Sequence, residues 1–301
     1  MRIGMIGLGR MGGSMSLRLL RGGHEVVVFD RDPQAVAQLV GEGALGAGSL
    51  SEMVGQLAPP RAVWLMVPAG RPTAEVIETL APLLDPGDVV VDGGNSRWTD
   101  TQAQATTLGA LGIALVDAGT SGGVWGLEEG YCLMVGGLDE AVALLQPAFE
   151  SLAPPNGWLH VGPTGAGHFT KMVHNGIEYA LMQGYAEGFE LLAASEFDLD
   201  LAAIAELWRH GSVVRSWLLD LAARALAEDP KLERIAGWVE DSGEGRWTVE
   251  AAIDRAVPTP TIALALFRRF ASRADNPFSD RLLAALRHQF GGHPLHPRER
   301  P

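Results

Sequence analysis

The chain has a single cysteine, Cys132, among its 301 residues. One cysteine cannot form an intrachain disulfide or a cysteine-based metal site, so we expect neither. This cysteine usage fits a reducing compartment, and we expect a cytoplasmic location.

Long hydrophobic runs are lacking too: glycines and arginines interrupt Met1–Leu20, and no stretch approaches the ~20 apolar residues that span a bilayer. The sequence therefore predicts no membrane partner and no signal peptide.

Positive charge is also scarce, with 23 Lys and Arg against 36 Asp and Glu, a formal net charge of -13. Nucleic acids and anionic membranes would meet no attractive field, so we exclude them as partners. An anionic metabolite can still bind if the few cations gather at one place. The length suits two domains, because one core rarely serves 301 residues.

The first half of the chain alternates short β-branched runs with amphipathic segments. This alternation predicts βαβ units and a parallel sheet with helices on both faces. The expected strands are Arg2–Ile6, Glu25–Phe29, Ala62–Val67, Val89–Asp92, Ala114–Asp117, Cys132–Val135 and Leu159–Val161. The expected helices are Met11–Arg21, Pro33–Val40, Thr73–Leu83, Thr101–Leu111 and Leu138–Leu152.

The pattern becomes almost wholly helical after Gly162-Pro163. The expected helices are Gly167–Ala194, Leu201–His210, Val214–Glu228, Trp247–Val257, Ile262–Ser272 and Phe278–Phe290. The predicted fold is therefore α/β, with a doubly wound parallel sheet over residues 1–164 and an all-α domain over residues 165–301. We expect the second domain to serve substrate binding and dimerisation.

A glycine-rich segment follows the first strand and opens the first helix. In it, Gly7 permits a tight turn, Gly9 lets the backbone approach a pyrophosphate, and Gly12 allows close helix–strand packing. The helix N-terminus adds N–H groups and a positive dipole. The alternative is a glycine-rich turn without a ligand. We expect a Rossmann-like NAD(P)-binding domain whose contacts here are Gly7, Leu8, Gly9, Arg10, Met11 and Gly12.

The second strand ends at Asp30, about 20 residues past the glycines. A carboxylate there accepts hydrogen bonds from the ribose hydroxyls and repels a 2′-phosphate, which favours NAD. Arg31 leaves NADP open, because an arginine there can stack on adenine or grip a 2′-phosphate. The alternative role for Asp30 is a helix N-cap ahead of Pro33, and the two roles are compatible.

Two loops follow neighbouring strands and should line the nicotinamide pocket, because ligands of open α/β sheets bind at the carboxyl ends of strands. One is Val67-Pro68-Ala69-Gly70, whose first three residues we expect to contact the cofactor. The other is Asp92–Ser96, in which Asn95 is the side chain best suited to meet a substrate hydroxyl as well as the cofactor.

A third strand end carries Ser121-Gly122-Gly123, which can present a hydroxyl and backbone N–H groups to a carboxylate. A plain turn is the alternative here.

The segment that opens the helical half places Lys171, Asn175 and Glu178 at i, i+4 and i+7, on one helix face, with His174 at its edge. A solvated Lys–Glu face is the alternative, but a desolvated lysine near the cofactor can act as a base.

The motifs GLGRMG, MVPAG, DGGNS, the Ser-Gly-Gly turn and the Lys-x-x-x-Asn helix together resemble the β-hydroxyacid dehydrogenase family. Within it, HFTKMVHNGIEY resembles the decarboxylating 6-phosphogluconate dehydrogenases, because relatives acting on small hydroxyacids carry Asn-Asn where this chain has Asn175-Gly176. DSGEGRWT at Asp241–Thr248 and RHQFGGH at Arg287–His293 add to the likeness, which spans nearly the whole chain and is closest to the short-chain branch.

The resemblance implies metal-free oxidative decarboxylation of 6-phospho-D-gluconate to D-ribulose 5-phosphate and CO2, a reaction of gluconate utilization and the pentose phosphate pathway. It implies that Lys171 is the base, that Glu178 protonates the enediol, and that Asn175 assists. The implied substrate contacts are Asn95, Ser121, Gly122, Gly123, His174, Asn175, Tyr179, Arg269, Arg287 and His293.

The resemblance also implies a homodimer or homotetramer in which Arg287 and His293 reach into a partner subunit's site. From the residues alone, Arg269 and Arg287 could equally form solvated helix faces. Ser242 departs from the long-chain members, which carry a lysine there, so the phosphate contact of that lysine does not carry over to this position, and its compensation by another residue stays open. Two other functions stay open: a dehydrogenase for a small unphosphorylated 3-hydroxy acid, and a non-catalytic NAD-sensing module.

Overall fold

The computed structural model describes residues 1–296 of the chain, and residues 297–301 lie outside it. The chain divides into two compact units, Met1–Asn175 and Gly176–Pro301, and helix α8 (Ala166–Ala193) passes from one into the other. The predicted second domain begins at residue 165, eleven residues before the second compact unit. The first turns of α8 belong to the first unit because they pack against its sheet, where a Cβ added at Gly167 would lie 2.4 Å from the Met134 carbonyl oxygen.

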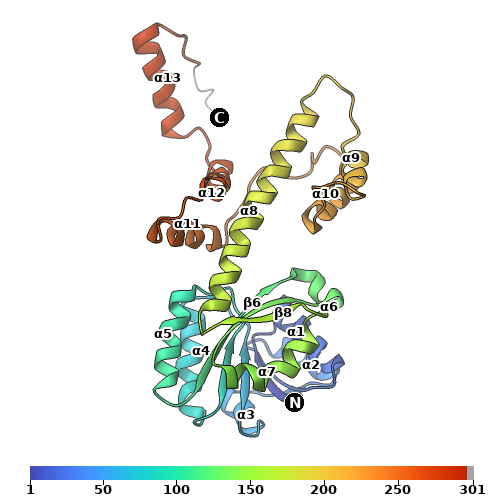
Figure 1. Cartoon of the computed structure of the whole chain (residues 1–301), viewed down its shortest axis with the longest axis vertical. Helices are drawn as coiled ribbons and strands as arrows, with labels where there is room; N and C mark the ends of the chain where they lie inside the picture. The colour runs from blue at the N-terminus through green and yellow to red at the C-terminus, as the bar shows by residue number, and fades with distance from the viewer. Residues whose placement is uncertain (297–301) are drawn as a thin grey trace. The chain divides into compact units, whose positions relative to one another are not determined.

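The first unit is built on one sheet of eight strands in the order β3-β2-β1-β4-β5-β6-β7-β8 (Figure 1). Its first six positions follow the doubly wound dinucleotide-binding order, with the topological switch between β1 and β4. The strands are β1 (Arg2–Ile6), β2 (Glu25–Phe29), β3 (Leu45–Gly46), β4 (Ala62–Leu65), β5 (Val89–Asp92), β6 (Ala114–Ser121), β7 (Cys132–Gly136) and β8 (Trp158–Gly162). The short β3 was not predicted from the sequence.

The doubly wound, mostly parallel sheet confirms the predicted fold class, although β6 and β7 pair antiparallel while the other described pairs are parallel. Because of this antiparallel pair, the expected end of β6 at Asp117 is wrong. Asp117 is the last residue of β6 paired with β5, but β7 continues the ladder from Asp117 to Ser121. The segment that leads to Gly122 is therefore a strand, and the turn begins only after Ser121.

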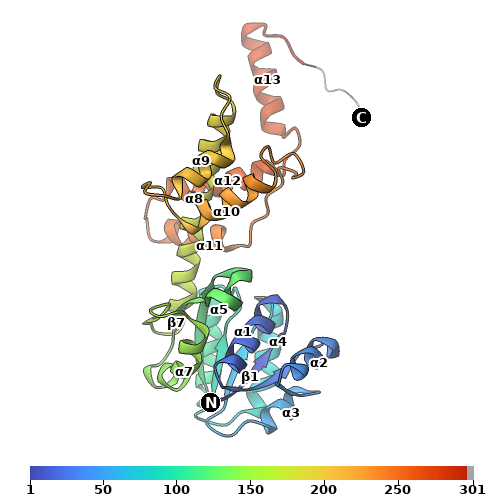
Figure 2. The ribbon, with the colours of Figure 1, turned by 90° about the vertical axis from the view of Figure 1, so that its right-hand side faces the viewer.

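Helices cover both faces of this sheet (Figures 1 and 2), and each face has its own apolar core. The helices of the first unit are α1 (Arg10–Arg21), α2 (Pro33–Gly41), α3 (Leu50–Gly55), α4 (Arg71–Leu80), α5 (Trp98–Gly109), α6 (Gly126–Glu129) and α7 (Asp139–Leu152), with 3-10 turns at Ala81–Leu83 and Gly123–Trp125. The sequence did not predict α3, α6 or the 3-10 turn Gly123–Trp125.

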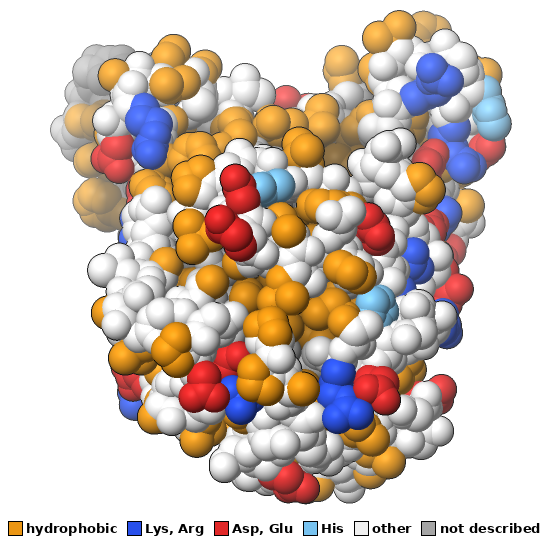
Figure 3. All heavy atoms as spheres, turned by 60° about the horizontal axis from the view of Figure 1, so that its bottom comes forward, with side chains coloured by type: hydrophobic (Ala, Val, Ile, Leu, Met, Phe, Trp, Pro, Cys, Tyr) orange, Lys and Arg blue, Asp and Glu red, His pale blue; other side chains and the backbone are white. Residues whose placement is uncertain are grey.

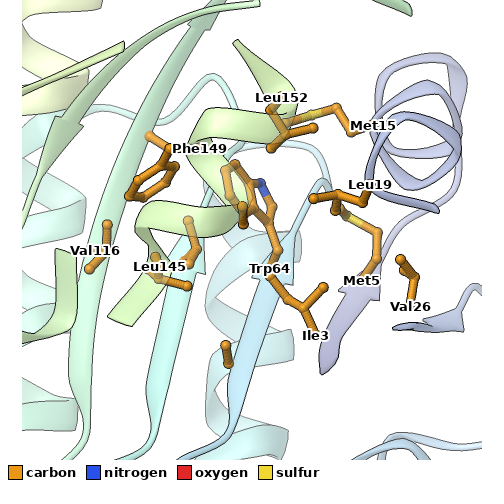
Figure 4. Packing of buried hydrophobic residues seen from close by; sticks show 14 of the residues in the cluster. Ile3, Met5, Met15, Leu19, Val26, Trp64, Val116, Leu145, Phe149 and Leu152 are labelled. Atoms are coloured by element: carbon orange, nitrogen blue, oxygen red, sulfur yellow. The ribbon is translucent and has the colours of Figure 1, made fainter. Parts of the chain in front are cut away.

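The core under α1 and α7 is shown in Figure 4, where Met15 and Leu19 of α1 face Trp64 of β4. The Trp64 ring also meets Phe149 of α7 edge to face, with ring centroids 5.8 Å apart. Aromatic pairs prefer this geometry, and truncating such a buried ring costs about 3–5 kcal/mol. This core fixes α1, and with it the glycine loop that precedes it.

The second unit contains the rest of α8 and five further helices. These are α9 (Leu201–Trp208), α10 (Trp217–Glu228), α11 (Glu244–Asp254), α12 (Pro260–Ser272) and α13 (Phe278–Gly291). One small core joins α9 to α10, and another joins Tyr179 of α8 to Ala265 and Leu266 of α12. α10 starts at Trp217, later than expected, because Ser216 caps it by accepting the Leu219 N–H. In Figures 1 and 2, α13 stands apart from α11 and α12.

Surface charges are mixed rather than gathered by sign. On the face in Figure 3, Lys and Arg side chains lie beside Asp and Glu side chains. Among the described ion pairs, exposed Arg2 donates to exposed Glu25 at 2.8 Å. In the described part of the chain, no helix has the length and apolarity needed to cross a membrane.

Candidate active site

The glycine loop between β1 and α1 has the geometry of a phosphate cradle. Gly7 has a positive φ of 88°, and a Cβ there would lie 2.5 Å from the Met66 carbonyl oxygen. Gly12 packs so closely on the loop that a Cβ would come within 1.9 Å of the Gly7 oxygen. At Gly9 a Cβ would meet no atom within 4 Å, so the backbone there is open. Open backbone before a helix N-terminus is what a pyrophosphate requires.

Asp30 holds this loop from the end of β2. One carboxylate oxygen accepts the Leu8 N–H at 2.5 Å and the other accepts the Asp32 N–H at 2.9 Å. The N-cap of α2 is Asp32, which accepts the Gln34 N–H, so the N-cap alternative for Asp30 is wrong. Arg31 is exposed beside it. A carboxylate next to the glycine loop is suited to ribose hydroxyls.

The loops after β4 and β5 meet at the carboxyl edge of the sheet. A Cβ on Gly94 would lie 2.9 Å from the Val67 carbonyl oxygen, so the two loops pack backbone to backbone. Pro68 and Ala69 follow on the first loop, where the Pro68 oxygen accepts the Thr73 hydroxyl at 2.9 Å. This edge is where a doubly wound sheet binds its ligand.

Asn95 and Lys171 come together at this edge. The Lys171 Nζ donates to the Asn95 Oδ1 at 2.5 Å, which joins the loop after β5 to α8. Both side chains are partly buried. The lysine amine is thus held by an amide oxygen at the carboxyl ends of the strands, where a base acting beside the cofactor has to be.

A second group of polar side chains joins the end of β6 to α8 within the first unit. The His174 Nδ1 is 3.1 Å from the Asn175 Oδ1, and its Nε2 is 3.5 Å from the Ser121 hydroxyl, the outer limit of a hydrogen bond. Gly122 and Gly123 follow with positive φ of 130° and 53°, and they turn the chain away from β6. The structure therefore brings Ser121, His174 and Asn175 together.

In the second unit, Tyr179 and Arg269 form a cationic cluster with the segment before α11. The Arg269 guanidinium lies 3.5 Å from the Tyr179 ring centroid and donates to the Glu240 carbonyl oxygen at 2.9 Å. The Tyr179 hydroxyl accepts the Ser242 N–H at 3.2 Å. Ser242 thus contributes its backbone to this cluster.

Sequence reasoning missed Asp241, whose side chain is only 5% exposed. It accepts two hydrogen bonds from Arg246, at 2.8 and 3.0 Å, and one from Arg273 at 2.9 Å. These bonds, Arg246 first, lower the pKa of the Asp241 carboxyl from 3.8 to about 2. Asp241 therefore ties the segment that carries Ser242 to α11 and α12.

Arg10 and Met11 open α1 in the first unit, and three further predicted residues lie in the second unit. Glu178 is half-buried on α8, Arg287 is exposed on α13, and His293 follows that helix. Their part in a substrate site stays a prediction. Among the described residues, no group of three or more His, Cys, Asp or Glu side chains could hold a metal ion.

Comparison with known proteins matches each half of the chain to a family model. Residues 2–162 match the family model described as the NAD binding domain of 6-phosphogluconate dehydrogenase, and residues 167–285 match its C-terminal domain. The NAD(+)-dependent, decarboxylating 6-phosphogluconate dehydrogenase of Haloferax volcanii is 47% identical over 97% of this chain and 98% of its own.

Solved structures of two dehydrogenases are similar to this chain over most of its length. The 6-phosphogluconate dehydrogenase of Plasmodium falciparum, solved with NADP+ and with 6-phosphogluconate, has a TM-score of 0.84 and 26% identity, over 100% of this chain and 67% of its own. The 3-hydroxyisobutyrate dehydrogenase of Salmonella typhimurium has a TM-score of 0.72 and 27% identity, over 88% and 91%.

Proposed function

The chain belongs to the 6-phosphogluconate dehydrogenase family, and from this premise we propose that it oxidises and decarboxylates 6-phospho-D-gluconate to D-ribulose 5-phosphate and CO2. NAD is the proposed electron acceptor. The observation that carries the proposal is the hydrogen bond between Lys171 Nζ and Asn95 Oδ1 at the carboxyl edge of the sheet. A dehydrogenase needs a base at this edge, whereas a module that only senses NAD does not.

The residues present fit NAD. The open backbone at Gly9 and the α1 N-terminus suit the pyrophosphate, and the Asp30 carboxylate suits the ribose hydroxyls. Asp30 and Asp32 would lie close to a 2′-phosphate and repel it, while exposed Arg31 stands between them in the sequence. NAD is therefore the proposed preference over NADP. NAD supplies the acceptor for the hydride that leaves C3 of the substrate.

The chemistry of the chain's own residues follows from their types. Lys171 takes the proton of the C3 hydroxyl as the C3–H bond breaks and the ketone forms. Protonated Lys171 then donates a hydrogen bond to that ketone. As the C1–C2 bond breaks and CO2 leaves, its electron pair forms the C2–C3 double bond, and the carbonyl π pair moves onto the ketone oxygen. The oxygen takes the lysine proton, giving an enediol. Glu178 protonates the enediol carbon that lost CO2, which becomes C1 of the product, while the hydroxyl on the neighbouring carbon returns its proton to Lys171. The product is D-ribulose 5-phosphate.

The substrate carboxylate and hydroxyls have donors in the first unit. The Ser121 hydroxyl, the backbone N–H groups of Gly122 and Gly123, and the side chains of His174 and Asn175 suit them. Asn95 holds Lys171 and suits a hydroxyl with its amide N–H. These roles are part of the proposal.

The phosphate is assigned to the cluster of Tyr179 and Arg269. Arg269 supplies a guanidinium fork that matches phosphate, and its stacking on Tyr179 fixes the orientation of that fork. In this proposal, Arg269 supplies the local positive charge that lets a chain of net charge -13 bind an anion. Arg287 and His293 would complete the pocket.

We propose a homo-oligomer in which the C-terminal segment serves a partner's site. Phe278, Leu282 and Leu286 recur at i, i+4 and i+8 on α13, and their exposed fractions are 68%, 45% and 49%. A row of apolar side chains on one helix face needs cover, and a second copy of the chain supplies it.

The test compares kcat/KM for 6-phosphogluconate and for unphosphorylated gluconate in the wild type, Arg269→Ala and Arg268→Ala. Arg268 is the matched control, because it is the exposed neighbour of Arg269 on α12. We expect a strong preference for the phosphorylated acid that only Arg269→Ala reduces. Equal values for the two acids would contradict the proposal and favour a small unphosphorylated 3-hydroxy acid, the substrate class of the Salmonella structure.

A further inference from the structure

Two fully buried aspartates lie side by side beneath the site in the first unit. Asp92 at the end of β5 and Asp117 of β6 are register partners, and both are 0% exposed. Each accepts hydrogen bonds from the backbone of a segment that carries a proposed functional side chain. Asp92 accepts the Gly94 N–H at 3.0 Å, next to Asn95. Neither aspartate has a role in the proposed chemistry.

Asp117 binds the start of α8 with both of its oxygens. One accepts the Gly165 N–H at 2.7 Å and the other accepts the His168 N–H at 2.7 Å. The first turn of a helix has N–H groups without partners in the helix, and a carboxylate there is favourable. Lys171 lies three residues after His168, about 4.5 Å further along the helix axis. Asp117 thus fixes the turn immediately before the lysine.

The fit between α8 and the sheet leaves no room for adjustment. A Cβ at Gly119 would lie 2.4 Å from the Lys171 Cβ, and a Cβ at Gly136 would lie 2.8 Å from the Gly167 nitrogen. The helix therefore rests on the bare backbone of β6 and β7. A small displacement of the first turn of α8 would move Lys171 away from Asn95.

We propose that Asp117 is a positioning residue for Lys171: with Asp92, its register partner, it holds the loop after β5 and the first turn of α8 so that Asn95 and Lys171 meet. The inference rests on the proposed function for its kinetic consequence, but not for its geometry.

The chemistry of the position requires a carboxylate. Burial raises the pKa of Asp117, the neighbouring Asp92 raises it further, and His168 and the two backbone N–H groups act in the opposite direction. An asparagine would avoid the cost of burying a charge, but its amide has one acceptor oxygen, and its NH2 would face the second N–H. Both bonds to α8 need both carboxylate oxygens.

The test is Asp117→Asn, with Asp88→Asn as the matched control. Asp88 is equally buried and directly precedes β5. Its carboxylate accepts the backbone N–H groups of Arg61 and Asp85 at the opposite edge of the sheet. We expect kcat for 6-phosphogluconate to fall on the order of 100-fold in Asp117→Asn, with little change in the KM for NAD. Asp88→Asn should keep the wild-type kcat. Wild-type kcat in folded Asp117→Asn, or equal losses in both variants, would overturn the proposal.

Hydrogen exchange tests the geometry without substrate. The Gly165 and His168 amides of the wild type should exchange slowly, and amides in residues 166–171 should exchange on the order of tenfold faster in Asp117→Asn but not in Asp88→Asn. Fast exchange of Gly165 and His168 in the wild type would overturn the proposal even if Asp117→Asn does not fold. If the Gly165 and His168 amides of the wild type exchange slowly but the wild type does not turn over 6-phosphogluconate, only the proposed function is contradicted.

Discussion

Replacing Asp241 by asparagine removes the carboxylate that Arg246 and Arg273 share. A pKa lowered from 3.8 to about 2 corresponds to about 2.4 kcal/mol of native-state stabilisation. The side chains of Arg246 and Arg273 are 50% and 24% exposed, so solvent screens these bonds. We therefore expect Asp241→Asn to lower the free energy of unfolding at pH 7 by about 1–2 kcal/mol.

The pH dependence of this loss has a defined sign. Because the folded-state pKa is lower than the unfolded one, the stabilisation is present above pH 4 and disappears as the pH falls from about 4 through about 2. The difference between wild type and Asp241→Asn, measured by urea unfolding, should therefore shrink below pH 4. The control Asp229→Asn removes a carboxylate whose side-chain partner is the more exposed Arg234, and should cost less. An Asp241→Asn variant as stable as the wild type at pH 7, or a pH-independent difference, would refute the reasoning.

Three further predictions concern the site. Lys171→Met should lower turnover by about 10²–10⁴-fold or more, because the base is lost, while NAD binding measured by fluorescence titration stays near wild type; normal turnover would remove Lys171 from the mechanism. Asp30→Asn should raise the NADP/NAD ratio of kcat/KM by removing the charge that repels a 2′-phosphate, whereas Asp32→Asn should raise it less; an unchanged ratio for Asp30→Asn would contradict the assignment. Deleting the residues after Leu286 should raise the KM for 6-phosphogluconate and leave the KM for NAD unchanged, and an unchanged substrate KM would exclude Arg287 from the pocket.

Local signals in the sequence predict most of the first unit. Strands β1, β2, β4 and β5 are short apolar runs, and the glycine loop is defined by spacing within six residues, so these features can be predicted locally. The two-residue β3 has no such run and could not be predicted. The extension of β6 to Ser121 could not be predicted in this way. It depends on antiparallel pairing with β7, and nothing in ALVDAGTS says which neighbour will supply the hydrogen bonds.

The residues of the candidate site also differ in whether the sequence alone can predict them. Lys171 and Asn175 are recognisable because helical spacing places them on one face. Asp117 and Asp241 are not, because each has a partner that is distant in sequence: Gly165 is 48 residues from Asp117, and Arg273 is 32 residues from Asp241. An isolated buried aspartate has no sequence pattern of its own, and its function as a holder of other residues emerges only from the folded chain.

The most direct test of the proposed reaction is the absorbance at 340 nm when the wild type is given 6-phosphogluconate with NAD and, in parallel, with NADP. We expect reduction of the nicotinamide with equimolar release of CO2, and a higher kcat/KM with NAD than with NADP. Reduction without CO2, or no reduction with either cofactor, would contradict the proposed oxidative decarboxylation.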